Sequence, residues 1–157
     1  MNKKEKKIDL WFSVGSTYTY LTVTRIKDTV KKNNININLK PFNVRTIMLE
    51  MDNRPFPPSK KIKVDHMWRD IQRRAEIYKI VVPSLPVPYP LKNMELANQI
   101  ALLGVNEGWC LEYLELTYHN WFINKLPAGE DENLILTFKK LNINYDEIKK
   151  KALKNEV

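Results

Sequence analysis

The first clear pattern along the chain is a hydrophobic run at residues 8–12, Ile-Asp-Leu-Trp-Phe. Its density of branched and aromatic side chains predicts a strand that is covered on both faces. Gly15 permits an unusual backbone angle where this strand ends. Apolar residues then recur at Val23, Ile26 and Val30, which is the spacing of a helix face that packs against a sheet. We therefore expect a strand, a tight turn and a helix.

A second strand is predicted at residues 35–39, where isoleucine, asparagine and leucine alternate strictly. A strand, a helix and a strand within so short a stretch form a βαβ unit. Its two strands are expected to be parallel, with a right-handed crossover.

The rest of the chain is predicted to be helical. A helical turn is expected at 44–51 and a long helix at 59–78, and further helices are expected at 93–105, 109–123, 130–141 and 146–155. The long helix has an apolar stripe, made of Val64, Met67, Trp68, Ile71, Ala75 and Tyr78. A connector with four prolines at 82–90 is too apolar to remain a solvated linker. The pattern as a whole predicts one α/β domain over residues 1–157.

The chain is basic, with a formal net charge of +8 over 157 residues. Such a charge is compatible with nucleic acid or an anionic surface as a partner. The lysines are dispersed and no nucleic-acid motif accompanies them, which favours solvated chain ends and no nucleic-acid partner. The N-terminus does not resemble a signal peptide, and no run approaches the roughly 20 apolar residues of a membrane span. We expect a cytoplasmic protein that does not bind membranes.

Metal and disulfide chemistry find little support in the sequence. Cys110 is the only cysteine, so an intrachain disulfide and a Cys-x-x-Cys motif are both excluded. The two histidines are far apart, so no metal-ligand spacing exists. We expect Cys110, Trp109 and His119 to be packed in the core. His66 is interpreted as a surface or partly buried residue, with a general base near neutral pH as the alternative.

Ser16 is the first candidate functional residue. It follows the strand at the expected start of the helix, where Ser16 or Thr17 can cap the helix by accepting a backbone hydrogen bond. Free N–H groups and the helix dipole also favour an anion at such a place. Both interpretations remain open from the local pattern alone.

Four segments of the sequence resemble the kappa-class glutathione transferases and the bacterial 2-hydroxychromene-2-carboxylate isomerases. Residues 16–21, Ser-Thr-Tyr-Thr-Tyr-Leu, are similar to the family motif Ser-Pro-Tyr-Ser-Trp/Tyr-Leu, with threonine in place of proline. Residues 47–55 resemble the loop whose asparagine touches glutathione, here Asn53. Residues 63–70 resemble the helix motif Lys-x-x-Tyr-Met-x-x-Asp, with His66 in place of tyrosine. Residues 88–91, together with Ala97 and Asn98, resemble the proline stretch of the isomerases and their next helix.

The resemblance implies a thioredoxin-like fold of the DsbA type, with a βαβ unit over about 7–41 and a helical insertion over about 43–157. It implies glutathione as the cofactor, a small aromatic carboxylate as the substrate and a homodimer as the assembly. The implied catalytic residue is Ser16, and the implied glutathione ligands are Ser16, Thr17, Tyr18, Asn53 and Lys63. Taken without the resemblance, Asn53 is a common turn residue and Lys63 is one of several surface lysines.

The activity implied by the resemblance is a glutathione-dependent isomerisation of the 2-hydroxychromene-2-carboxylate type, through transient addition of the thiolate. The related disulfide oxidoreductases carry cysteines where this chain has Ser16 and Thr19, so loss of redox chemistry is implied. A kappa-type glutathione transferase and an inactive glutathione-binding or interaction module are the alternatives.

One family segment has no counterpart in the sequence. The thioredoxin-like families have a β-hairpin and a helix after the insertion, and the hairpin carries a Gly-x-Pro motif that pairs with glutathione. No strand pair is evident after Leu91, so a C-terminally truncated chain is expected. The first strand would then keep an open edge through which the protein is expected to self-associate.

Overall fold

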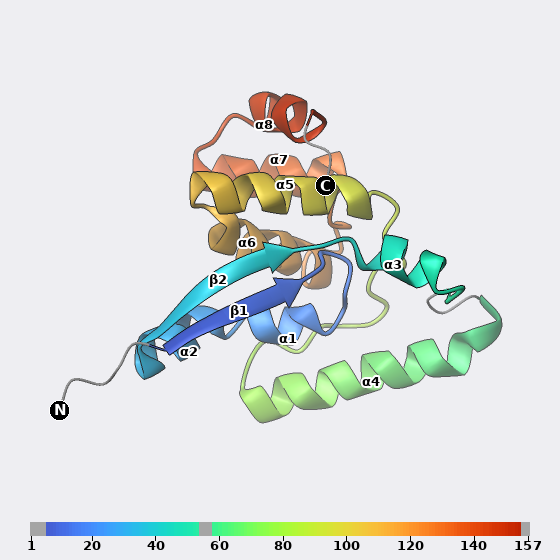
Figure 1. The fold of residues 1–157 in the computed structure, drawn as a ribbon. Helices are drawn as coiled ribbons and strands as arrows, with labels where there is room; N and C mark the ends of the chain where they lie inside the picture. The colour runs from blue at the N-terminus through green and yellow to red at the C-terminus, as the bar shows by residue number, and fades with distance from the viewer. Residues whose placement is uncertain (1–5, 54–57, 155–157) are drawn as a thin grey trace.

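The computed structural model describes residues 6–53 and 58–154. Two strands, β1 (Lys6–Phe12) and β2 (Ile35–Pro41), pair in parallel, with Ile8 opposite Ile37 and Leu10 opposite Leu39. The helices α1 (Thr19–Val23) and α2 (Ile26–Asn33) connect them. The predicted parallel βαβ unit is therefore confirmed (Figure 1).

The single helix expected between the strands is interrupted. Arg25 leaves the helical region with φ −123°, so α1 ends at Val23 and α2 starts at Ile26. The Thr24 hydroxyl and the Arg25 Nε donate hydrogen bonds of 2.8 and 2.7 Å to carbonyl oxygens of α1. Side chains that bond the preceding turn in this way often bend or end a helix.

The remaining helices follow the predicted order. They are α3 (Val44–Glu50), the short 3₁₀ helix η1 (Pro58–Lys60), α4 (Lys61–Tyr78), α5 (Met94–Glu107), α6 (Cys110–Phe122), α7 (Asp131–Leu141) and α8 (Tyr145–Ala152). Figure 1 shows α5 to α8 stacked on one side of the strands and α4 on the other. Within the described ranges, no helix combines the length and the apolar character that a bilayer span requires.

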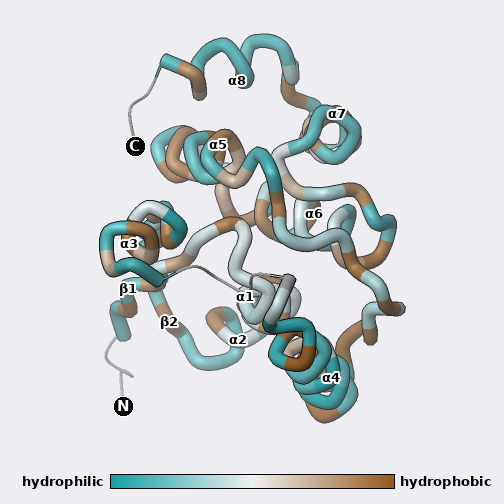
Figure 2. Tube along the Cα trace, turned by 90° about the vertical axis from the view of Figure 1, so that its right-hand side faces the viewer, coloured by the Kyte–Doolittle hydropathy of each residue, from teal (hydrophilic) through white to brown (hydrophobic). Residues whose placement is uncertain are grey.

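The long helix α4 confirms most of its predicted stripe, although Val64 is only half-buried and Tyr78 at the end of the helix is exposed. Met67, Trp68, Ile71 and Ala75 are buried, whereas Arg69 faces solvent. Figure 2 shows hydrophobic and hydrophilic positions alternating around α4, as an amphipathic helix requires.

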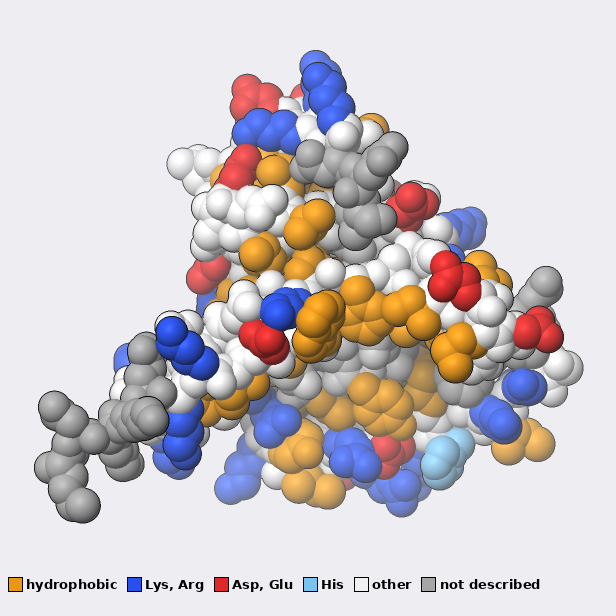
Figure 3. Space-filling view, in the orientation of Figure 1, with side chains coloured by type: hydrophobic (Ala, Val, Ile, Leu, Met, Phe, Trp, Pro, Cys, Tyr) orange, Lys and Arg blue, Asp and Glu red, His pale blue; other side chains and the backbone are white. Residues whose placement is uncertain are grey.

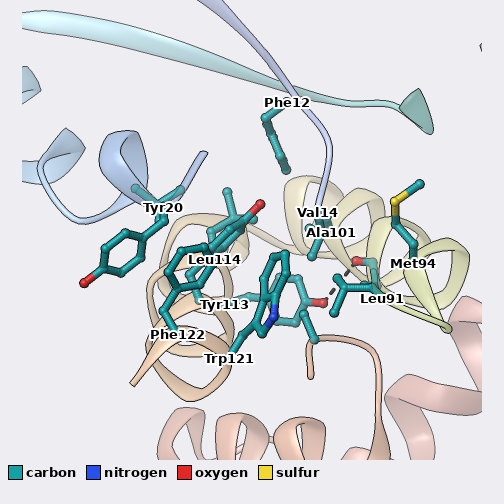
Figure 4. Packing of buried hydrophobic residues seen from close by; sticks show 14 of the residues in the cluster. Phe12, Val14, Tyr20, Leu91, Met94, Ala101, Tyr113, Leu114, Trp121 and Phe122 are labelled. Atoms are coloured by element: carbon teal, nitrogen blue, oxygen red, sulfur yellow. Dashed lines mark hydrogen bonds between the residues drawn. The ribbon is translucent and has the colours of Figure 1, made fainter. Parts of the chain in front are cut away.

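The core is rich in aromatic side chains that α6 supplies. The ring of Phe122 stacks on that of Tyr20 at a centroid distance of 4.3 Å, and Trp121 is fully buried beside them (Figure 4). The indole N–H of Trp121 donates a 2.7 Å hydrogen bond to the carbonyl of Pro88. Val87 is also buried, so the proline-rich connector is packed there as predicted, whereas Val82 and Leu85 are exposed.

Three residues in and beside α6 were predicted to lie in the core, and only one of them is fully buried. Cys110 is buried, as predicted, and Trp109 is half-buried. His119 is exposed, so its predicted packing is wrong. Its neighbours in sequence, Tyr118 and Asn120, turn inward instead, because successive residues of a helix point about 100° apart.

The prediction that β1 is covered on both faces is wrong. Ile8 is 46% exposed and Trp11 is 61% exposed, although these side chains point to opposite faces of the sheet. Among the described residues, β1 pairs with β2 alone. One face of the sheet lies over α2 and leaves an open apolar groove. The other face is solvated, and there Lys40 forms a 2.8 Å ion pair with Asp9. Hydrophobic side chains consequently reach the surface in the middle of the face that Figure 3 shows.

Candidate functional site

The loop that follows β1 is held by the buried amide of Asn98, which α5 supplies. The Asn98 Oδ1 accepts a 2.7 Å hydrogen bond from the Val14 N–H, and its Nδ2 donates to the Val14 carbonyl at 3.1 Å. A third bond joins Nδ2 to the carbonyl of Met94 at 2.8 Å. The Val14 side chain itself points into the core, above Trp121 and beside Ala101 (Figure 4). Asn98 therefore replaces the strand partner that the Val14 backbone would otherwise need.

A second buried side chain, Tyr118 of α6, contacts the backbone of the same loop at Ser13, Gly15 and Ser16. Its phenolic oxygen lies 2.9 Å from the Ser16 carbonyl oxygen and 3.2 Å from that of Ser13. It also accepts a weak hydrogen bond of 3.5 Å from the Gly15 N–H. Burial raises the pKa of the Tyr118 phenol, so the hydroxyl remains protonated and can donate.

Gly15 is required by the close approach of α5. Its φ of +128° lies in a region that L side chains rarely adopt. A Cβ at this position would overlap the Met94 sulfur and lie 2.6 Å from the Met94 Cγ. The predicted role of Gly15 in the turn is confirmed, and the contact with Met94 adds a second constraint.

Ser16 does not cap the helix that follows it. The helix α1 starts at Thr19, with Tyr18 at the cap position and no side-chain cap bond. The N–H groups of Thr19 and Tyr20 instead donate to the backbone carbonyls of Ser16 and Thr17 at 3.2 and 3.3 Å. Because tight backbone turns already satisfy these donors, the predicted cap from Ser16 or Thr17 is wrong.

The Ser16 side chain is therefore available for another purpose. It is half-buried, and its hydroxyl makes no hydrogen bond to any residue that the structure describes. The neighbouring Thr17 is buried, and its hydroxyl donates to the Met67 sulfur at 3.1 Å. Thr17 thus fixes the loop against α4, whereas Ser16 faces a cavity.

This cavity, which we call the Ser16 cavity, has a volume of about 290 Å³. It is lined by Gly15, Ser16, Thr17, Tyr18, Val44, Arg45, Met48, Met67, Tyr89, Pro90, Leu91 and Met94. Three thioethers and two phenol rings give it an apolar surface. Among the described residues, the lining contains one cation, Arg45, and no carboxylate. Such a site favours a small ligand that is apolar with an anionic part.

Tyr18 lies at the rim of the Ser16 cavity and is held by α4. Its hydroxyl donates a 2.9 Å hydrogen bond to the Asp70 carboxylate, which also accepts a 2.8 Å bond from the Arg74 Nε. The bonds from Arg74 and Tyr18 lower the pKa of Asp70. Partial burial and the Asp70 carboxylate raise the pKa of Tyr18, which is therefore a neutral phenol at physiological pH.

Lys63 and His66 lie next to the Ser16 cavity. Both are exposed on α4 and line an adjoining open cavity of about 420 Å³, together with Tyr18, Ile62 and Met67. The two cavities share Tyr18 and Met67. Lys63 therefore shares a cavity with Tyr18 but not with Ser16 and Thr17.

Asn53 is the one predicted site residue that lines neither of these two cavities. It is exposed just past α3, where its N–H donates to the Met48 carbonyl at 2.8 Å. This placement agrees with the turn role that its residue type also indicated. Residues 54–55 of the same segment lie outside the described residues.

Several residues that build the site were not found from the sequence. Asn98 and Tyr118 hold the loop across 84 and 102 positions of the chain, and no local pattern reports contacts so distant. Arg45 of α3 and Met94 of α5 line the cavity. The sequence of these segments indicates a helix but does not indicate that the two side chains face a cavity. Within the described ranges, no cluster of side chains suits a metal ion.

Comparisons with known proteins agree with this architecture. The family model of the DSBA-like thioredoxin domain matches residues 7–157. No curated protein matches the chain. Among solved structures, a 2-hydroxychromene-2-carboxylate isomerase superimposes with a TM-score of 0.77 at 18% sequence identity, over 95% of this chain and 72% of that one. At this identity the likeness shows the fold alone. From the family model and the fold together, the chain belongs to the DSBA-like thioredoxin domain family.

Proposed function

We propose that the protein is a glutathione-dependent isomerase that acts on a substrate of the 2-hydroxychromene-2-carboxylate type. The observation that carries this proposal is the Ser16 hydroxyl, which has no partner among the described residues and faces an apolar cavity. Tyr118 holds its backbone in place. In support, an isomerase with that substrate in its name has the same fold.

The proposed task of Ser16 is to stabilise a thiolate. A free thiol has a pKa of about 8.5, so it is mostly protonated at neutral pH and is a weak nucleophile in that form. A hydroxyl that donates to sulfur favours the anion and lowers this pKa. No carboxylate of the described residues lines the cavity, so none of them repels the thiolate there.

Bound glutathione would supply a thiolate that forms a C–S bond to an unsaturated carbon of the substrate. The ring C–O bond would break, with the hemiketal proton passing to the ring oxygen, and after rotation about a C–C bond the C–S bond would break and release the same thiolate. The sulfur that adds is the sulfur that leaves, so no oxidant or reductant is consumed. The protein donates the Ser16 hydrogen bond at both steps. The side chains of Met67 and Tyr89 keep water away from the reacting atoms.

The other predicted glutathione ligands differ in how close they lie to Ser16. Thr17 and Tyr18 line the Ser16 cavity, and Lys63 can meet a glutathione carboxylate in the adjoining cavity. Asn53 lies outside both cavities, so we give it no contact with the thiol. We extend the proposal to a homodimer, since the open edge of β1 offers a surface for self-association.

The test compares two substrates with glutathione present. The purified protein is assayed with 2-hydroxychromene-2-carboxylate and with 1-chloro-2,4-dinitrobenzene, and glutathione binding is measured by calorimetry. We expect turnover of the chromene carboxylate that is lost in Ser16→Ala. Turnover of the halogenated electrophile alone would assign the protein to the transferases. Glutathione binding without either turnover would identify a binding module and contradict the proposal.

A further inference from the structure

Arg45 has no acidic partner among the described residues. Arg74 pairs with Asp70 at 2.8 Å, and Lys40 pairs with Asp9 at the same distance. Arg45 is half-buried in α3, and no carboxylate of the described residues forms an ion pair with it. Burying part of a charge without a counter-ion is costly, which makes an external anion the natural partner.

The Arg45 guanidinium is fixed at the wall of the Ser16 cavity. Its Nη2 donates a 2.8 Å hydrogen bond to the carbonyl of Leu91, which lies just before α5. A guanidinium has five N–H donors in a planar fork, so this bond leaves others for a ligand. The backbone of Arg45 is anchored as well, because its N–H donates to the Asn43 Oδ1 at 3.1 Å.

The positive charge of Arg45 acts inside the cavity. Burial raises the pKa of the Tyr89 phenol, and the charge of Arg45 partly offsets this rise. Tyr89 lines the same cavity. The apolar part of the same lining includes Met48, Leu91 and Met94. A planar fork beside thioethers and a ring suits a flat unsaturated or aromatic group that ends in a carboxylate.

We propose that Arg45 recognises the carboxylate of the second substrate, and thereby selects unsaturated or aromatic carboxylates for the Ser16 cavity. This inference rests on the proposed function in assigning the thiol to Ser16. The volume of about 290 Å³ is at the lower end of ligand pockets, so the acid is a small one. Arg45 binds the carboxylate of the acid, while the Ser16 hydroxyl donates a hydrogen bond to the sulfur of glutathione.

The first experiment measures binding without glutathione and without turnover. The dissociation constants of trans-cinnamate and of cinnamamide are compared by calorimetry, since the two probes share a shape and differ in charge. We expect the acid to bind at least tenfold more tightly, in line with a charge-assisted hydrogen bond. Equal binding of the two probes, or binding of neither, would overturn the inference.

The variant Arg45→Gln keeps a side-chain donor for the Leu91 carbonyl and removes the charge. It is expected to bind cinnamate as weakly as cinnamamide. Arg69→Gln is the matched control, because Arg69 is exposed on α4 and lines neither cavity. An equal loss in the control would overturn the assignment to Arg45. The wild-type comparison of the two probes needs no variant, so an absent preference for the acid overturns the inference even if Arg45→Gln does not fold.

A second arm separates the two possible sources of the carboxylate. S-methylglutathione is titrated into the wild type and Arg45→Gln, and we expect its dissociation constant to change less than twofold. A tenfold loss would mean that Arg45 binds a glutathione carboxylate and would overturn the inference. A protein that prefers cinnamate through Arg45 but binds no S-methylglutathione would refute the proposed function and leave this inference standing.

Discussion

The phenolic oxygen of Tyr118 lies 2.9 Å from the carbonyl oxygen of Ser16, although 102 positions separate the two residues in the chain. The helix α6 thus sets the position of the loop that follows β1. Asn98 of α5 does the same for Val14. The helical part of the fold is consequently more than a cover, since it determines where the Ser16 hydroxyl points.

Tyr118→Phe is expected to damage both the stability and the site. It removes the phenolic hydroxyl that contacts Ser13, Gly15 and Ser16, while the Ser13 and Ser16 carbonyls keep backbone N–H donors, so the expected cost is about 0.5–1.5 kcal/mol of unfolding free energy. Glutathione affinity should fall as well, because the loop loses its anchor. Urea unfolding and calorimetry measure the two effects.

Tyr113→Phe is the matched control for this substitution. Tyr113 is equally buried in α6, and its hydroxyl donates to the Ala97 carbonyl at 3.0 Å, away from the loop. We expect a comparable loss of stability with unchanged glutathione affinity. Affinity that falls equally in both variants would show that Tyr118 acts through general stability.

Gly15→Ala should be far more harmful than a typical glycine substitution. It adds the overlap with Met94 to an unfavourable φ, and together these cost about 3 kcal/mol or more. Gly108→Ala is the control, because Gly108 also has a positive φ of +86° but open space around it. A thermal or urea denaturation series compares them. Equal losses in the two variants would argue against the close packing of α5 on the loop.

Cys110 should be inert toward thiol reagents in the folded protein. Burial, with a smaller effect from Glu112, raises the pKa of its thiol to about 12, and the residue is 2% exposed. At pH 8 the raised pKa keeps the group protonated, and the thiolate is the reactive form. Ellman's reagent should therefore react only after denaturant is added. Rapid labelling of the native protein would contradict the packing of α6.

The open edge of β1 should make the protein self-associate. Ile8 is 46% exposed on a strand whose outer edge has no partner among the described residues. A lysine on such an edge discourages strand pairing, so Ile8→Lys is expected to shift the sedimentation profile toward monomer. Ile62→Lys carries the same charge change at a side chain that is 85% exposed on α4 and should leave the profile unchanged. A wild type that sediments wholly as monomer would refute this prediction.

The elements of the fold were predictable because their signals are local. Alternation in β2 and the apolar stripe of α4 report directly on which side of an element is covered. The coverage of β1 was predicted wrongly for the opposite reason. Its apolar run indicates that the strand can be buried, but whether it is depends on which other segments reach it.

The site was predictable only in part. Ser16, Thr17 and Tyr18 are adjacent in sequence and necessarily share one loop, so their proximity followed from the motif. Whether Ser16 caps a helix depends on backbone turns that the residue types do not determine. Arg45 was missed because its significance is a missing acidic partner, which depends on the positions of all other charged residues.

The central claim is that the Ser16 hydroxyl stabilises the glutathione thiolate, and the pKa of bound glutathione tests it most directly. The absorbance of the thiolate near 240 nm is titrated against pH with the wild type and with Ser16→Ala. Since the Ser16 side chain bonds to no described residue, the variant should keep its stability within about 0.5 kcal/mol. We predict that the wild type lowers the thiol pKa below its free value and that Ser16→Ala restores it. Equal pKa values in the two proteins, with glutathione bound to both, would contradict the account.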